Sequence, residues 1–86
     1  MSKCIEKYID MMMGIVKNDY PTINLIVSGH KIAFQSEKKT IIGSISVFSN
    51  GDNIIVMFKG KQYFNVNIND DEISDAIIEP LIWILE

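Results

Sequence analysis

The middle of this sequence alternates apolar and polar residues with a period of two, and this alternation limits the possible folds more than any other feature. From Thr22 to Ile68, turn-forming residues recur about every ten positions and separate the alternating segments. The turns are expected at Ser28–Lys31, Glu37–Thr40, Ser49–Asp52 and Lys59–Lys61. Tight turns between consecutive strands predict an antiparallel meander of five strands.

The expected strand register depends on turn length, because a shift of one residue moves every side chain to the other face of the sheet. Two-residue turns at Gly29–His30, Lys38–Lys39 and Asn50–Gly51 all place apolar side chains on one face. Asn50–Gly51 is the strongest signal, since both central residues of a type I′ turn need a positive φ. In this register Phe34 and Phe58 flank Gly43. The residues predicted to face the core are Ile23, Leu25, Val27, Ile32, Phe34, Ile41, Gly43, Ile45, Val47, Ile54, Val56 and Phe58.

The last turn departs from this scheme, because a two-residue turn there would point Asn65 and Asn67 into the core. A three-residue loop at Lys59–Lys61 instead places Phe64, Val66 and Ile68 inside. The sequence therefore predicts an irregular turn or a bulge at this position.

Amphipathic segments flank the predicted sheet on both sides. Ser2 to about Lys17 has apolar residues at three- and four-residue spacing, with Ser2 as the cap and Tyr20–Pro21 after its end. Asn69 as N-cap and Glu72 three residues later predict the start of a second helix. The buried stripe of this helix is expected to consist of Ile73, Ala76, Ile77, Leu81 and Ile84.

Proline cannot donate a backbone hydrogen bond, so Pro80 is expected to kink or end the second helix near Glu79. Residues 81–85 are apolar on every side and are left open as either a helical turn or a short strand. The fold class is α+β: residues 1–86 are expected to form a single domain, with both helices on the apolar face of the sheet.

Cys4 and His30 are the only cysteine and histidine, so the sequence offers no disulfide framework or metal-ligand set, and no cofactor is expected. The apolar run Met11–Val16 is too short for a signal peptide, and Pro80–Leu85 is too short to span a bilayer. A cytoplasmic location is therefore expected, in the host if the chain is encoded by a phage.

The sheet face opposite the helices is the main candidate site, because it mixes small polar residues with apolar ones. A face that is merely solvated would carry more charge, although an ordinary wet sheet face remains the alternative. The predicted partner-binding residues are Ile42, Ser44, Ser46, Ile55, Met57, Tyr63 and Asn65. A homodimer is also expected, because this face and the apolar C-terminal segment are a large area for so short a chain to cover.

Lysines at the second and fourth turns, Lys38, Lys39, Lys59 and Lys61, are expected at one end of the meander, with Lys31 on a nearby strand. They suggest a site for an anion or a nucleic-acid backbone. The absence of arginine and the net charge of −3 argue against nucleic acid, and solubilising turn residues are the simpler interpretation. Asp71, Asp75 and Glu79 form an acidic edge on the second helix that suits either a basic partner or solvation.

No sequence motif for catalysis is present, and His30 has only Ser28 nearby as a possible partner. We therefore expect a non-enzymatic protein-binding module. Small size and an AT-rich type of composition suggest an accessory or inhibitor protein of a phage or mobile element, acting on a host or defence protein. One alternative is a protein that sequesters a nucleotide or other small ligand at a dimer seam lined by Ser44, Ser46, Tyr63 and the turn lysines. Another is a sequence-nonspecific nucleic-acid binder that uses those lysines.

Overall fold

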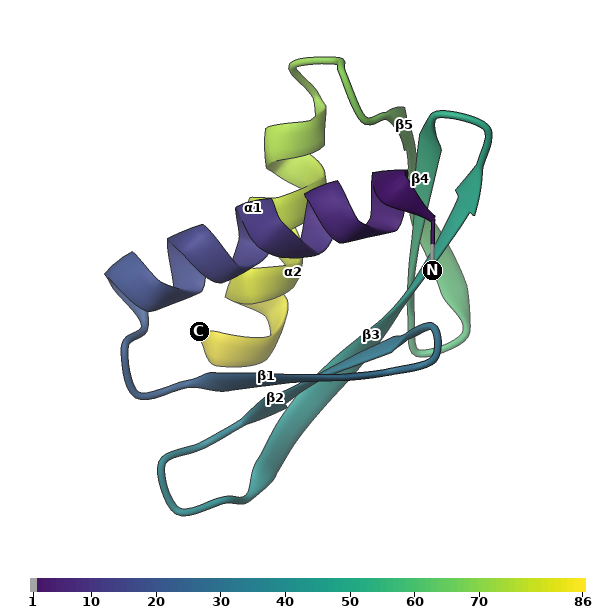
Figure 1. Cartoon of the computed structure of the whole chain (residues 1–86). Coiled ribbons are helices and arrows are strands. Elements are labelled where there is room, and N and C mark those ends of the chain that lie inside the picture. Colours follow the sequence, from purple (N-terminus) through teal and green to yellow (C-terminus); the bar gives the residue numbers. More distant parts are fainter. Residues whose placement is uncertain (1) are drawn as a thin grey trace.

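The structure is a computed structural model that describes residues 2–86, and it confirms the α+β fold. The five strands pair in sequential order as one antiparallel sheet, and both helices cover the same face of that sheet (Figure 1). The elements are α1 (Lys3–Asp19), β1 (Asn24–Ser28), β2 (Lys31–Gln35), β3 (Ile41–Asn50), β4 (Asn53–Phe58), β5 (Lys61–Asn67) and α2 (Ile73–Leu85).

Helix α1 has the predicted cap and the predicted buried stripe. The Ser2 hydroxyl accepts a hydrogen bond from the backbone N–H of Ile5 at 3.2 Å, which satisfies a donor that the first helical turn leaves free. Its inward face consists of Ile5, Tyr8, Ile9, Met12 and Val16, all of them buried. These side chains join one core with the inward residues of the sheet and of α2.

The first hairpin has the predicted two-residue turn, because Ser28 pairs with Lys31. The hairpin between β3 and β4 turns one residue later than predicted, since Asn50 pairs with Asn53 and leaves Gly51 and Asp52 as the turn. Only the first of these has a positive φ, 60°, which is typical of a type II′ turn rather than type I′. Val47 consequently pairs with Val56 instead of Ile54.

This two-residue shift preserves the predicted faces but changes the neighbours of Gly43. Phe34 pairs with Gly43 as expected, whereas the space above the glycine is filled from α2. A Cβ at Gly43 would lie 3.0 Å from Cγ2 of Ile84. Gly43 therefore allows the second helix to approach the sheet closely.

A bulge at the start of β3 makes one of the core predictions wrong. Phe34 pairs with Gly43 but Gln35 pairs with Ile41, so Ile42 is an extra residue in β3. The side chains of Ile41 and Ile42 are consequently 52% and 46% exposed, and Ile41 does not enter the core. Val27, on edge strand β1, is also more exposed than predicted, at 37%.

The irregularity predicted near the last hairpin is present, but it lies inside the strands. The turn itself has two residues, Lys59 and Gly60, with φ values of 51° and 80° that suit type I′. Val56 pairs with Phe64 and Met57 pairs with Gln62, so Tyr63 is the extra residue of the bulge. Val66 and Ile68 are buried as predicted, and Phe64 packs against the core.

Helix α2 starts later than predicted and continues further. Its first residue is Ile73, and the predicted cap at Asn69 is wrong, because Asn67 and Asp70 accept the backbone hydrogen bonds of this connection. Each of these side chains bonds the N–H two residues ahead, which stabilises turns instead of a helix start. The helix does not end at Glu79, since it runs through Pro80 to Leu85 and includes residues 81–85.

Candidate protein-binding surface

The face of the sheet that the helices leave uncovered carries most of the predicted partner-binding residues. Ser46 pairs with Met57, and Ile55 pairs with both Phe48 and Asn65, so these side chains alternate onto the same face. Ser44 joins them beside Ala33. We call this surface the open face; its residues are Ile26, Lys31, Ala33, Ser44, Ser46, Phe48, Ile55, Met57, Gln62 and Asn65.

The open face combines apolar side chains with neutral hydrogen-bonding groups. Phe48, Ile55 and Met57 are half-buried by their neighbours, and Ile26 is 40% exposed. Among the described residues of this face only Lys31 carries a full charge. Apart from Ala33, the remaining positions carry amides and hydroxyls, so the face offers apolar contact area together with donors and acceptors that remain neutral.

His30 borders the open face at the first hairpin turn. Its ring stacks on that of Phe48, with centroids 4.5 Å apart and an angle of 28° between the planes. Nδ1 of His30 lies 3.2 Å from the carbonyl oxygen of Val47. These contacts hold the imidazole against the sheet and extend the apolar area of the face.

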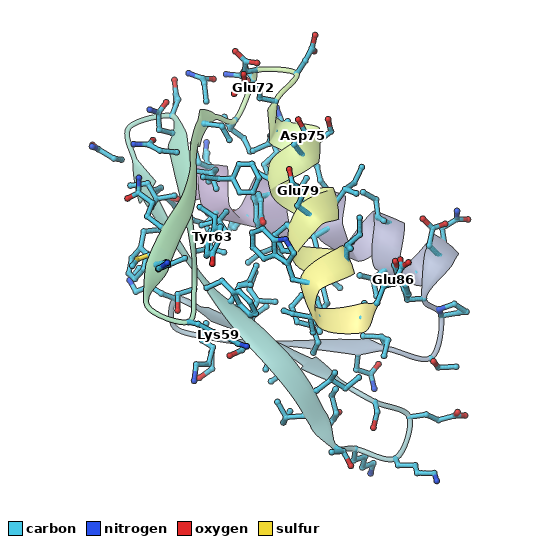
Figure 2. The ribbon with its side chains drawn as sticks, turned by 180° about the vertical axis from the view of Figure 1, so that it is seen from behind. Lys59, Tyr63, Glu72, Asp75, Glu79 and Glu86 are labelled. Carbon is cyan, nitrogen blue, oxygen red and sulfur yellow. The ribbon has the colours of Figure 1, made fainter. Side chains whose placement is uncertain are left out.

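Tyr63 was predicted on this face, but the bulge in β5 turns it toward α2. Its ring centroid lies 4.7 Å from that of Trp83 and 6.3 Å from that of Phe58. Trp83 also stacks on Phe58 at 5.3 Å and on Phe64 at 6.2 Å. Figure 2 shows Tyr63 on the side of the molecule where α2 lies. Gln62 occupies the open-face position next to Met57 instead.

Ile42 and Ser44 reach a second surface next to these rings. They line a pocket of about 330 Å³ together with Lys59 and Trp83. The ammonium of Lys59 lies 5.2 Å from the centroid of the Phe58 ring, within reach of a cation–π interaction. We call this surface the aromatic corner; its residues are Ile42, Gly43, Ser44, Phe58, Lys59, Tyr63, Trp83 and Ile84.

The sequence did not reveal the aromatic corner, because it depends on two features that local patterns leave undetermined. Trp83 lies in the segment that was open between helix and strand, and Tyr63 reaches it only through the bulge. The one signal in the sequence was Tyr63, an aromatic residue close to the irregular turn or bulge predicted at Lys59–Lys61.

The four turn lysines do not meet at one place. Lys59 lies at the aromatic corner and Lys61 pairs with Phe58. Lys38 and Lys39 belong to the turn before Ile41, and Figure 1 shows that turn projecting well beyond the one between β4 and β5. A single anion would therefore meet at most one of these pairs.

The predicted acidic edge lies on the exposed side of α2. Figure 2 shows Asp75 and Glu79 one turn apart along the helix, with Glu72 just before its first residue. Asp71 belongs to the preceding turn, where its carbonyl accepts a hydrogen bond from the Ser74 hydroxyl at 2.8 Å. These carboxylates face solvent away from the open face.

Within residues 2–86, no three His, Cys, Asp or Glu side chains come close enough together to hold a metal ion. No helix in the same range is long and apolar enough to cross a membrane. No protein-family model, curated protein or solved structure matches the chain.

Proposed function

We propose that this chain is a non-enzymatic protein-binding module whose open face docks on an uncharged, partly apolar surface of a partner protein. One observation carries the proposal: a whole sheet face lies outside the helical layer and presents Phe48, Ile55 and Met57 with a single charge, Lys31. A face evolved only for contact with water has no reason to exclude charge from its central strands.

The composition of the open face suits the centre of a protein interface. Interface centres are depleted in charged residues and enriched in aromatic residues and methionine, which gain contact area without desolvating an ion. Ser46 and Asn65 supply hydrogen-bonding groups that keep a partner in register. The aromatic corner adjoins this face through Ser44 and adds Trp83 and Tyr63, residue types that often dominate binding energy.

The geometry supports this function better than it supports the two alternatives. A nucleotide site was expected to combine Ser44, Ser46 and Tyr63 with the turn lysines, but Tyr63 points toward Trp83 and the lysines are divided between two places. That division also weakens the case for a continuous phosphate-binding track along the sheet. The accessory or inhibitor role, and the origin in a phage or mobile element, remain predictions from size and composition.

The proposal is tested with charged substitutions on the open face and a photo-crosslinker. Ser46→Lys and Asn65→Glu place a charge where the partner would exclude water, whereas Asp75→Lys on α2 is the control away from this face. A benzophenone amino acid at Met57 should crosslink a distinct protein in a lysate of the source organism. Ser46→Lys should abolish that crosslink, and Asp75→Lys should preserve it.

Sedimentation of the purified chain distinguishes a partner from a second copy. If the crosslinked species is the chain itself, and if Ser46→Lys converts a dimer into a monomer, the open face is a self-association surface. If neither open-face substitution alters any crosslink at Met57, the open face is not the binding surface and the proposed function fails.

A further inference from the structure

A groove of about 610 Å³ runs between the two helices, away from both the open face and the aromatic corner. Its floor is mostly apolar: Met11 and Ile15 are half-buried, and Ile77 beneath them is buried in the core. Helix α1 contributes Asp10, Met11, Gly14, Ile15, Asn18 and Asp19, and α2 contributes Ser74 and Ile77.

Gly14 lies on this groove in the interior of α1, and nothing within the chain requires a glycine there. Its φ is not positive, so the backbone conformation is open to any residue. A Cβ at this position would have no atom within 4 Å, so close packing inside the chain does not require glycine either. Glycine in a helix interior destabilises the helix relative to alanine. A missing side chain at this point does, however, allow the backbone of another molecule to approach α1 closely.

The charge around the groove indicates which kind of molecule approaches. Carboxylates of Asp10 and Asp19 line it, and no lysine is among its lining residues. From Gln62 to Glu86 the sequence contains no basic residue, and Lys7 of α1, which donates a hydrogen bond to Oδ1 of Asn69 at 3.3 Å, is not among the residues that line the groove. A second copy docked groove to groove would set aspartates against aspartates, which disfavours self-association here.

We infer that the groove between α1 and α2 binds a basic amphipathic helix of a partner protein. The apolar stripe of that helix packs on Met11 and Ile15, with its backbone closest to α1 at Gly14. Its lysines or arginines reach Asp10 and Asp19 at the rim. This site is independent of the proposed function, which uses the opposite side of the sheet and an uncharged partner surface.

The test uses the full chain and a fluorescein-labelled synthetic helix of about 16 residues, with leucines on one face and lysines on the other. In the matched peptide every lysine is replaced by glutamate. The lysine peptide should shift the backbone amide resonances of Met11, Gly14 and Ile15, and its affinity should fall as salt is added. The glutamate peptide should leave the same resonances in place.

Substitutions separate groove binding from general attraction to an acidic protein. Gly14→Gln should weaken peptide binding by about tenfold while the melting temperature stays equal or rises, because glutamine fills the groove and favours helix. Gly14→Ala should give a smaller loss of affinity. Asp19→Asn should weaken binding by about threefold, whereas Glu37→Gln, which removes one charge from a remote turn, should not.

The inference is overturned if about 1 mM lysine peptide, a concentration that detects even weak binding, shifts no groove resonance. It is also overturned if the shifts are confined to the open face, or if Gly14→Gln binds the peptide as tightly as the wild type. Ser46→Lys should leave peptide binding intact, so failure of the groove and failure of the open face are distinguishable.

Discussion

The hydroxyl of Tyr8 donates a hydrogen bond of 2.6 Å to the backbone carbonyl of Ala76. In an uninterrupted helix this carbonyl would accept from the N–H of the residue four positions later, but that residue is Pro80, which has no N–H. Tyr8 lies in α1 and is fully buried. A side chain of the first helix thus satisfies the carbonyl that the proline leaves free, and α2 can continue to Leu85.

We predict that Tyr8→Phe lowers the free energy of unfolding by about 1–3 kcal/mol, because it leaves a buried carbonyl without a donor. In the Pro80→Ala background the same change should cost less, by about 1 kcal/mol, since the alanine introduced by that substitution supplies the missing N–H. Urea unfolding of the wild type, the two single variants and the double variant measures this coupling between Tyr8 and Pro80. Equal costs of Tyr8→Phe in both backgrounds would contradict the explanation for Pro80.

Stability should also fall at alkaline pH through Tyr8. Burial raises the pKa of its hydroxyl above the ordinary tyrosine value of 10.0, so the folded protein keeps a proton that the unfolded chain loses. The contribution of the Tyr8 proton to the free energy of unfolding is therefore complete below pH 10, and it declines as the pH rises above that value. Thermal melts between pH 8 and pH 11 should show that the wild type loses stability more steeply than Tyr8→Phe. For one proton, the difference in the free energy of unfolding grows by about 1.4 kcal/mol per pH unit. Parallel pH profiles would show that Tyr8 does not titrate differently on folding.

Gly51→Val should destabilise the hairpin between β3 and β4. Gly51 has a φ of 60°, a conformation that a β-branched residue resists, and no neighbouring atom compensates for the strain. We expect a loss of about 1–2 kcal/mol in the free energy of unfolding, measured by urea titration. An unchanged midpoint would mean that this turn has another conformation in solution.

Gly14→Ala should have the opposite effect. Its backbone is helical and a methyl group would meet no atom within 4 Å, so the gain in helix propensity is not offset by a clash. Differential scanning calorimetry should show a stabilisation of about 0.5–1 kcal/mol. A destabilised variant would indicate that the groove is closed in solution and that Gly14 serves packing within the chain.

The two faces of the sheet should respond differently to a lysine. Ser46→Lys, on the open face, should change the free energy of unfolding by no more than about 1 kcal/mol. Ile45→Lys, one residue earlier, should unfold the chain, because Ile45 is only 2% exposed beneath the helices. Circular dichroism melts compare the two directly. If Ser46→Lys is the variant that unfolds, the open face is covered in solution.

Local periodicity was enough to predict which face each strand residue occupies wherever the strands are regular. Ile32, Phe34, Ile45, Val47, Ile54 and Val56 are all buried as the alternation predicts, even though the turn at Gly51–Asp52 is displaced by one residue. Each side chain stays on its predicted face of the sheet because that displacement changes the pairing of β3 with β4 by two residues, which is an even number. The Ser2 cap and the buried stripe of α1 were predictable for the same reason, since their signals lie within a few residues of each other.

Three features of the candidate surfaces depend on contacts between distant parts of the chain. The bulges at Ile42 and Tyr63 keep Ile41 out of the core and turn Tyr63 toward Trp83, because strand pairing with β2 and β4 determines which residue is extra. The missing side chain of Gly43 makes room for Ile84 of α2, and not for the phenylalanine rings of adjacent strands. Helix α2 continues through Pro80 because Tyr8, 68 residues away from Ala76 in sequence, supplies a hydrogen bond that no nearby residue offers.

Local sequence patterns thus specify the helices, the strands and their inward faces, which follow from backbone geometry repeated every two or 3.6 residues. The places where these repeats are interrupted depend on the assembled fold. An unpaired backbone group is tolerated in the core only when the fold brings it a partner, as Tyr8 does for the carbonyl of Ala76.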